Sequence, residues 1–158
     1  MHRRLEVRGL VQGVGFRPWV WQEATRLGLI GWVRNTSFGV EIDLHGEAPQ
    51  LDTLQDLLWH APAPARVEQV VAISAYGAEP APGGRAAPFA IRPSITGAHT
   101  TALLGADLSI CPQCLSELFD PTNRRWRHPF VHCPHCGPRY TVTRELPFDR
   151  AHTSLGHF

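Results

Sequence analysis

The chain has 158 residues, of which 43% are hydrophobic and 18% charged, so it can build a hydrophobic core and lacks the composition of a disordered protein. Its formal net charge of +1 provides no broad basic surface, which argues against a nucleic-acid partner and against an anionic membrane. No apolar run approaches the ~20 residues of a membrane-spanning helix, and the start, MHRRLEVRGL, contains no apolar signal-peptide core. We therefore expect a cytoplasmic protein with reduced cysteines.

Hydrophobic periodicity divides the first part of the chain into alternating strands and helices. In chain order, the predicted elements are a strand over residues 4–11, a helix over 16–27, strands over 30–34 and 40–45, a helix over 51–58, and strands over 67–76 and 89–91. Gly28 can end the first helix. The order β-α-β-β-α-β is that of the ferredoxin-like fold, so we expect an α+β domain.

A glycine-rich loop, RGLVQGVGFRP at residues 8–18, joins the first strand to the first helix. Glycine permits positive φ and close approach of a ligand, and successive N–H groups at a helix start form an anion site. Arg17 adds a planar set of donors that matches phosphate oxygens. Because a residue before proline disfavours the helical conformation, we expect Arg17 outside the helix, at the rim of the loop.

The glycine spacing alone is equally compatible with a tight turn beside a solvated arginine. The loop lacks the Gly-Lys-Ser/Thr ending and the full G-x-G-x-x-G pattern of nucleotide-binding loops. A nucleotide is therefore the less favoured ligand.

Asn35 stands where the second predicted strand ends. A crossover through one helix makes the first and second strands parallel, so both end at the same edge of the sheet. Asn35 and the glycine loop can therefore face one pocket, where the carboxamide could accept a hydrogen bond from water and donate one to an oxyanion. An asparagine is also common in hairpin turns, and that alternative stays open.

Residues 9–46, GLVQGVGFRPWVWQEATRLGLIGWVRNTSFGVEIDLHG, resemble an acylphosphatase, and the resemblance extends over residues 5–91. It implies that Arg17 binds phosphate and that Asn35 orients the nucleophilic water. It also implies that backbone N–H groups cradle the phosphate oxygens. The loop residues concerned are Gln12, Gly13, Val14, Gly15 and Phe16. The implied reaction is hydrolysis of a carboxyl–phosphate mixed anhydride without a metal, which positioning and charge neutralisation can largely catalyse.

Two cysteine pairs, CPQC and CPHC, form the pattern C-x₂-C-x₁₈-C-x₂-C. This spacing predicts one zinc site in a reduced compartment, with the ligands Cys111, Cys114, Cys133 and Cys136. Four thiolates leave no open position for water, so the zinc is predicted to be structural. His132 and His135 lie beside these ligands and could substitute for them, while a redox role lacks a thioredoxin-like setting.

The run NRRWRH lies between the two cysteine pairs and contains Trp126. Arginines beside an aromatic ring could bind nucleic acid, but such a short run is more often a solvated surface. With a net charge near zero, we do not expect a nucleic-acid partner.

The two parts in this order resemble the N-terminal portion of the HypF family, the carbamoyltransferases of [NiFe] hydrogenase maturation. The resemblance implies that the first domain hydrolyses carbamoyl phosphate and that a hydrogenase-maturation protein is the partner. It also implies that ATP-dependent carbamoyl transfer needs family domains that this chain does not include. The alternative is a non-enzymatic phosphate-binding or docking module, with a zinc ribbon for a protein or nucleic-acid partner.

The expected organisation follows from these features. We expect an acylphosphatase-like domain over residues 1–93, a connector over 94–110, a four-cysteine zinc-finger segment over 111–150 and a tail without a defined element over 151–158.

Overall fold

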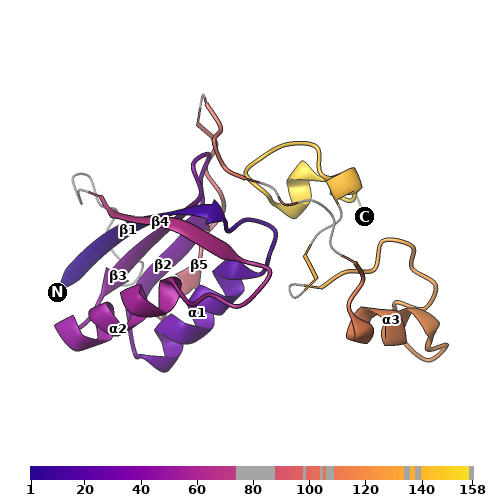
Figure 1. The fold of residues 1–158 in the computed structure, drawn as a ribbon, viewed down its shortest axis with the longest axis horizontal. Helices are drawn as coiled ribbons and strands as arrows, with labels where there is room; N and C mark the ends of the chain where they lie inside the picture. The colour runs from indigo at the N-terminus through magenta and orange to yellow at the C-terminus, as the bar shows by residue number, and fades with distance from the viewer. Residues whose placement is uncertain are drawn as a thin grey trace.

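The structure is a computed structural model that describes residues 1–73, 88–97, 99–103, 105, 109–133, 136–137 and 140–156. Its elements are β1 (His2–Leu10), α1 (Phe16–Arg26), β2 (Ile30–Asn35), β3 (Val40–His45), α2 (Ala48–Leu58), β4 (Arg66–Ala72), β5 (Ala90–Ile91), α3 (Pro112–Phe119) and the 3-10 turns Tyr140–Val142 and Arg150–His152. The expected α+β class is confirmed, with a cysteine-rich segment beyond the sheet (Figure 1). No helix in these residues is long and apolar enough to cross a membrane.

A five-stranded sheet in the order β4-β1-β3-β2-β5 forms the centre of the first domain. β1 pairs antiparallel with β3 and β4, and β2 pairs antiparallel with β3 and parallel with β5. Since β1 and β2 each run opposite to β3, they run parallel to one another, as expected. The loop after β1 and the end of β2 therefore meet at one edge of the sheet.

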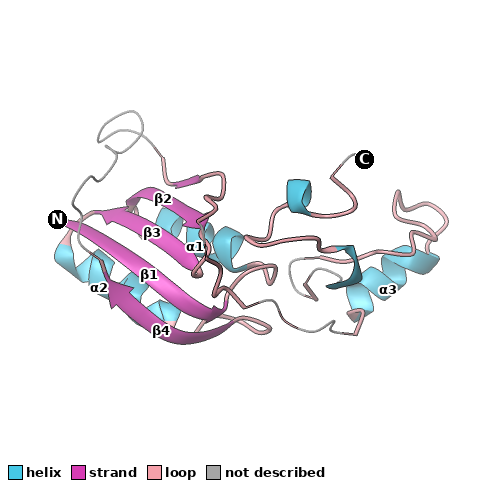
Figure 2. Cartoon of the chain, turned by 90° about the horizontal axis from the view of Figure 1, so that it is seen from above, coloured by secondary structure: helices cyan, strands magenta, loops and turns pink. Residues whose placement is uncertain are grey.

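Helices α1 and α2 cover one face of this sheet (Figure 2). The hydrophobic core lies between the sheet and these two helices and is formed by buried apolar side chains of both. They include Leu5, Val7, Val20, Ala24, Ile42, Leu51, Leu54 and Leu58. The helical residues recur at intervals of three and four and the strand residues at intervals of two, which is why each element buries one face.

The opposite face of the sheet is polar but tightly packed. Trp32 on β2 is 0% exposed. The guanidinium groups of Arg4 and Arg34 lie 5.4 and 4.4 Å from its ring centroid. Both arginines donate to Glu41 at 2.8 Å. The alternating charged residues of β3 are thus buried by ion pairs and a cation–π stack rather than exposed.

Arg17 lies inside the first turn of α1, so the expectation that it stands outside the helix is wrong. Gly15, with φ 75°, caps the helix, and the next residue, Phe16, is buried in the core. Pro18 occupies the first turn, where its missing N–H requires no intrahelical partner. Anchoring of Phe16 outweighs the preference that proline imposes on the residue before it.

Two further expectations concern later segments: part of one lies outside the described residues, and the other differs from the structure. β4 ends at Ala72, and residues 74–87, which include the rest of the predicted strand over 67–76, lie outside the described residues. The tail expected to lack structure contains the turn Arg150–His152, and Thr153 forms an antiparallel bridge with Thr143.

Ile42 on β3 is 0% exposed and sits in the core. Ile42→Ala should lower the free energy of unfolding by about 2–5 kcal/mol, because it removes buried methyl groups and leaves a cavity. Urea denaturation followed by circular dichroism measures this loss. The matched control is Ile95→Ala, at a residue that is 45% exposed, which should change stability by no more than about 0.5 kcal/mol.

Candidate functional site

The loop between β1 and α1 presents bare backbone. Gly13 and Gly15 have φ of 72° and 75°, the left-handed region that glycine adopts without strain. Within the described part of the chain, the N–H groups of residues 12–17 donate no intramolecular hydrogen bond. They stand at the start of α1, where the helix dipole is positive, so they can bind an anion.

The side chain of Gln12 holds this loop in place. It is buried, and its Nε2 donates to the carbonyl oxygens of Thr36 and Gly39, both at 2.7 Å. The loop is thereby fixed to the turn between β2 and β3, which carries Asn35 at its start. The sequence predicts only a backbone role for Gln12, since a glutamine in a loop gives no signal that its side chain is buried.

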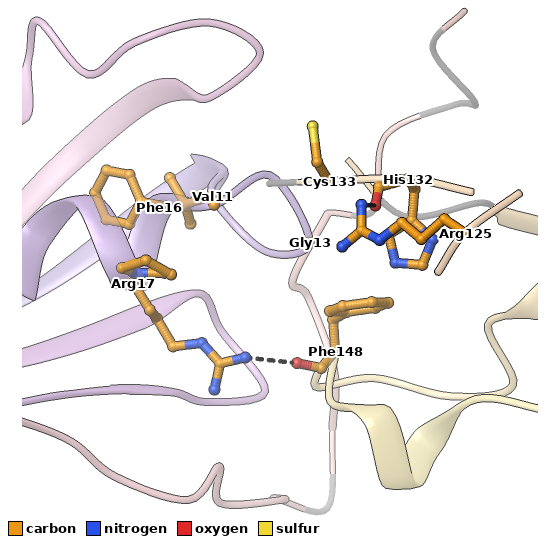
Figure 3. Close-up of a pocket in the computed structure, with 10 residues that line it drawn as sticks. Val11, Gly13, Phe16, Arg17, Arg125, His132, Cys133 and Phe148 are labelled. Atoms are coloured by element: carbon orange, nitrogen blue, oxygen red, sulfur yellow. Dashed lines mark hydrogen bonds between the residues drawn. The ribbon is translucent and has the colours of Figure 1, made fainter. Parts of the chain in front are cut away.

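Arg17 and Asn35 converge on one oxygen atom, the backbone carbonyl oxygen of Phe148. Arg17 Nη2 donates to it at 3.1 Å and Asn35 Nδ2 at 2.8 Å. Figure 3 shows the guanidinium reaching the Phe148 carbonyl beside the loop. The two side chains predicted to face one pocket thus share one hydrogen-bond acceptor, and the space between them accepts an oxygen atom.

The same segment makes two more contacts with the site. Arg17 Nη2 also lies 2.9 Å from Asp149 Oδ1, and the Phe148 N–H donates to Gln12 Oε1 at 2.8 Å. Neither Phe148 nor Asp149 was singled out in the sequence. They lie in a stretch without periodicity, and only the tertiary structure brings them to the loop.

Asn35 has one polar atom without a partner. Its side chain is 0% exposed, and Oδ1 accepts no hydrogen bond from the described residues. A buried acceptor without a donor is unfavourable by about 1–3 kcal/mol. A water molecule or a ligand hydroxyl beside Oδ1 would remove that penalty.

A cavity of about 300 Å³ opens beside the loop. It is lined by Gly13, Gly15 and Arg17 from the first domain and by Arg125, His132, Cys133 and Phe148 from the later segment (Figure 3). The two parts are joined by the hydrogen bonds of Phe148, and Gly137 lies close to the loop, since a Cβ added to it would be 3.2 Å from the carbonyl oxygen of Gly13. The cysteine-rich segment therefore forms one wall of the cavity.

The four cysteines come together as their spacing predicted. The Sγ atoms of Cys111 and Cys133 are 3.7 Å apart, and Cys136 Sγ lies 3.9 Å from both Cys133 and Cys114. A tetrahedral zinc with bonds of about 2.3 Å requires sulfur–sulfur distances of ~3.8 Å. Cys111 caps α3, and its Sγ accepts from the N–H of Cys114 at 3.5 Å. The cluster fits a tetrahedral zinc ion.

Among the described residues, His132 is not part of the cluster. His132 Nδ1 lies 2.9 Å from the carbonyl oxygen of Phe130. His135, the other candidate substitute, lies outside the described residues.

The four thiols lie close together, and their pKa values differ with their burial and their hydrogen bonds. Burial raises the pKa of the Cys114 thiol well above its usual range. At Cys136, burial acts in the same direction, but hydrogen bonds from the backbone of Cys133 and Cys111 outweigh it and lower the pKa to about 7. Four thiolates so close together repel one another, and a divalent cation is the group that removes this repulsion.

Known protein families match both the sheet domain and the cysteine-rich segment of the chain. The acylphosphatase family model matches residues 3–81, and that of the HypF finger matches residues 110–143. Carbamoyltransferase HypF2 of Cupriavidus necator is 47% identical over 157 residues, covering 98% of this chain and 19% of the relative. The acylphosphatase of Alcanivorax borkumensis is 48% identical over 66 residues, covering 41% of this chain and 72% of the relative. A crystal structure of full-length HypF in the phosphate- and nucleotide-bound form has a TM-score of 0.82 and 32% identity, covering 99% of this chain and 20% of that one.

The sheet domain, with its glycine loop, thus belongs to the acylphosphatase family. Together with the HypF finger that follows it, this domain matches the acylphosphatase domain and finger of the HypF family, as the sequence resemblance implied. The chain spans about a fifth of the length of the HypF relatives that it matches.

Cys114→Ser should remove most of the bound metal, because serine cannot supply a thiolate and Cys114 is fully buried in the cluster. Protein purified under reducing conditions should contain about one zinc per chain and the variant much less, by atomic emission. Ser116→Ala, on the same helix but outside the cluster, is the control. Full zinc content in Cys114→Ser would contradict the assignment.

Proposed function

We propose that this chain hydrolyses acyl phosphates in the cavity beside the glycine loop. The observation that carries the proposal is the convergence of Arg17 Nη2 and Asn35 Nδ2 on one oxygen atom. In the reaction, an oxygen of the substrate's phosphoryl group takes the place of the Phe148 carbonyl oxygen. Family membership supports this, because acylphosphatases are the relatives that the first domain resembles along most of their length.

The phosphoryl group is bound by Arg17 and by the N–H groups of residues 12–17, which donate to no other described residue. Phosphoryl transfer passes through a loose transition state that spreads negative charge over the equatorial oxygens. Donors fixed in advance around those oxygens stabilise this charge without reorganisation. The burial of Gln12 supplies that rigidity, because it fixes the loop to the turn after β2.

Asn35 orients the attacking water through Oδ1, which is buried and has no partner among the described residues. The water oxygen forms a bond to phosphorus while the bond between phosphorus and the acyl oxygen breaks. The carboxylate leaves with the electron pair of that bond, and the water proton passes to phosphate or solvent. A carboxylate is a good leaving group, so the proposal requires no side-chain nucleophile and assigns no cofactor to this site.

Carbamoyl phosphate is the proposed substrate. The cavity of about 300 Å³ has room for a small acyl group beside the phosphoryl position. The relatives that match the whole chain are named carbamoyltransferases, which supports a carbamoyl group in particular. We assign carbamoyl transfer, and a hydrogenase-maturation partner that accepts it, to the longer HypF protein of which this chain matches a part.

The zinc ion proposed for the four cysteines is structural. With four sulfur ligands the site has no open position, so the ion would stabilise the fold of the finger and take no part in hydrolysis.

The proposed function also includes the expected domain boundaries: an acylphosphatase-like domain, a connector and a zinc finger.

Arg17→Ala should lower kcat/KM for carbamoyl phosphate about 10³-fold, because it removes the only side-chain cation proposed to contact the phosphoryl oxygens. Phosphate release from carbamoyl or acetyl phosphate, without ATP, measures the change. Arg26→Ala is a matched control: Arg26 lies in the same helix and pairs with Glu23 on the surface at 2.6 Å. Wild-type turnover by Arg17→Ala would contradict the mechanism.

Asn35→Ala should lower kcat about 10²-fold, because it removes the group proposed to orient the water, and should also raise KM, because it removes the Nδ2 donor to a phosphoryl oxygen. The same phosphate-release assay measures both constants, with circular dichroism to verify folding. A wild-type protein that binds phosphate but hydrolyses no acyl phosphate would instead favour the docking module.

A further inference from the structure

We infer that residues 147–149 act as an intramolecular competitor of the substrate, so that the site opens only when this segment leaves. The inference rests on the proposed function, since it concerns regulation of the same site. Residues 147–149 contact the side chains that hold or surround the proposed phosphoryl position.

The backbone of Phe148 is bound at both of its polar atoms. Its carbonyl oxygen accepts from Arg17 and Asn35, and its N–H donates to Gln12 Oε1. Phe148 lies 113 residues after Asn35 in the sequence, so chain connectivity does not bring them together. The segment is bound by the site as a ligand would be.

Asp149 makes the segment resemble an anion. Its carboxylate lies 2.9 Å from Arg17 Nη2, and the two side chains are 30% and 18% exposed. A carbonyl oxygen and a carboxylate oxygen thus accept from the guanidinium that would bind the phosphoryl oxygens. Charge-assisted hydrogen bonds of this kind are about twice as strong as neutral ones, so Asp149 supplies much of the segment's affinity. Arg17 cannot serve the carboxylate and a phosphoryl group at once.

The segment is anchored from the other side by the tail rather than by the sheet. His152 Nδ1 lies 2.6 Å from the carbonyl oxygen of Pro147. Thr143 and Thr153 form a bridge that closes the tail on itself. The turn can therefore leave the site with these hydrogen bonds intact, while it loses those to Gln12, Arg17 and Asn35.

Competition of this type has a defined effect on kinetics. The apparent dissociation constant of a ligand equals its intrinsic constant divided by the fraction of molecules whose site is open. Weakening the segment raises that fraction, so it lowers KM for substrate and the inhibition constant of inorganic phosphate by the same factor. The chemical step, which takes place after the segment has left, keeps its rate.

Asp149→Ala should lower KM for acetyl phosphate and the inhibition constant of inorganic phosphate about tenfold, with kcat within about twofold of wild type. Asp52→Ala is the matched control, because Asp52 also pairs with an arginine, Arg3 at 2.8 Å, on a distant surface. Unchanged constants in Asp149→Ala would overturn the inference. A raised KM would also overturn it, since it would mean that Asp149 positions Arg17 for substrate.

Hydrogen–deuterium exchange provides a readout that does not depend on activity. The Phe148 N–H is protected by Gln12 in the closed site, so adding inorganic phosphate to the full chain should increase deuterium uptake in the peptide that contains it. Phosphate that binds without raising this uptake would contradict the competition.

The two proposals can fail separately. If wild type and Asp149→Ala both hydrolyse no acyl phosphate, the proposed function fails. Calorimetric titration with inorganic phosphate then still tests the competitor. The inference requires that Asp149→Ala bind phosphate more tightly than wild type. If both proteins hydrolyse the substrate with equal KM, the function stands and the competitor is wrong.

Discussion

The antiparallel pairing of both β1 and β2 with β3 is the constraint on which the site depends. It makes β1 and β2 parallel with one strand between them, so the chain leaves both at the same edge. The loop after β1 and Asn35 at the end of β2 meet there, close enough for Arg17 and Asn35 to share one acceptor. The buried core under the sheet holds this register, because a shift by one residue would expose its apolar side chains.

Local patterns in the sequence were sufficient to predict most of the elements and to single out the residues of the proposed anion site. Glycines before a helix, an arginine at its start and an asparagine at a strand end are signals that act over a few residues. The conformation of Arg17 was predicted wrongly because the preference before proline is local, whereas burial of Phe16 is tertiary. The buried Glu41 of β3 follows the same rule, since its partners Arg4 and Arg34 lie on other strands.

The segment around Phe148 could not be predicted for a related reason. Its side chains give no periodic pattern, and the atoms that contact the site belong largely to the backbone, which every sequence provides. Only Asp149 offers a chemical signal, and a single acid in a loop is ordinarily solvated. The side chain of Gln12 is a similar case, because its buried hydrogen bonds depend on the position of the next turn.

The contact between Gly137 and Gly13 joins two sites that chemistry alone would treat as independent. Gly137 directly follows Cys136, so a change in the position of Cys136 would be passed to backbone that lies close to the glycine loop. Thermodynamic reciprocity then applies to the pair: to whatever extent a metal in the finger alters the affinity of the loop for an anion, the anion alters the affinity of the finger for the metal by the same factor.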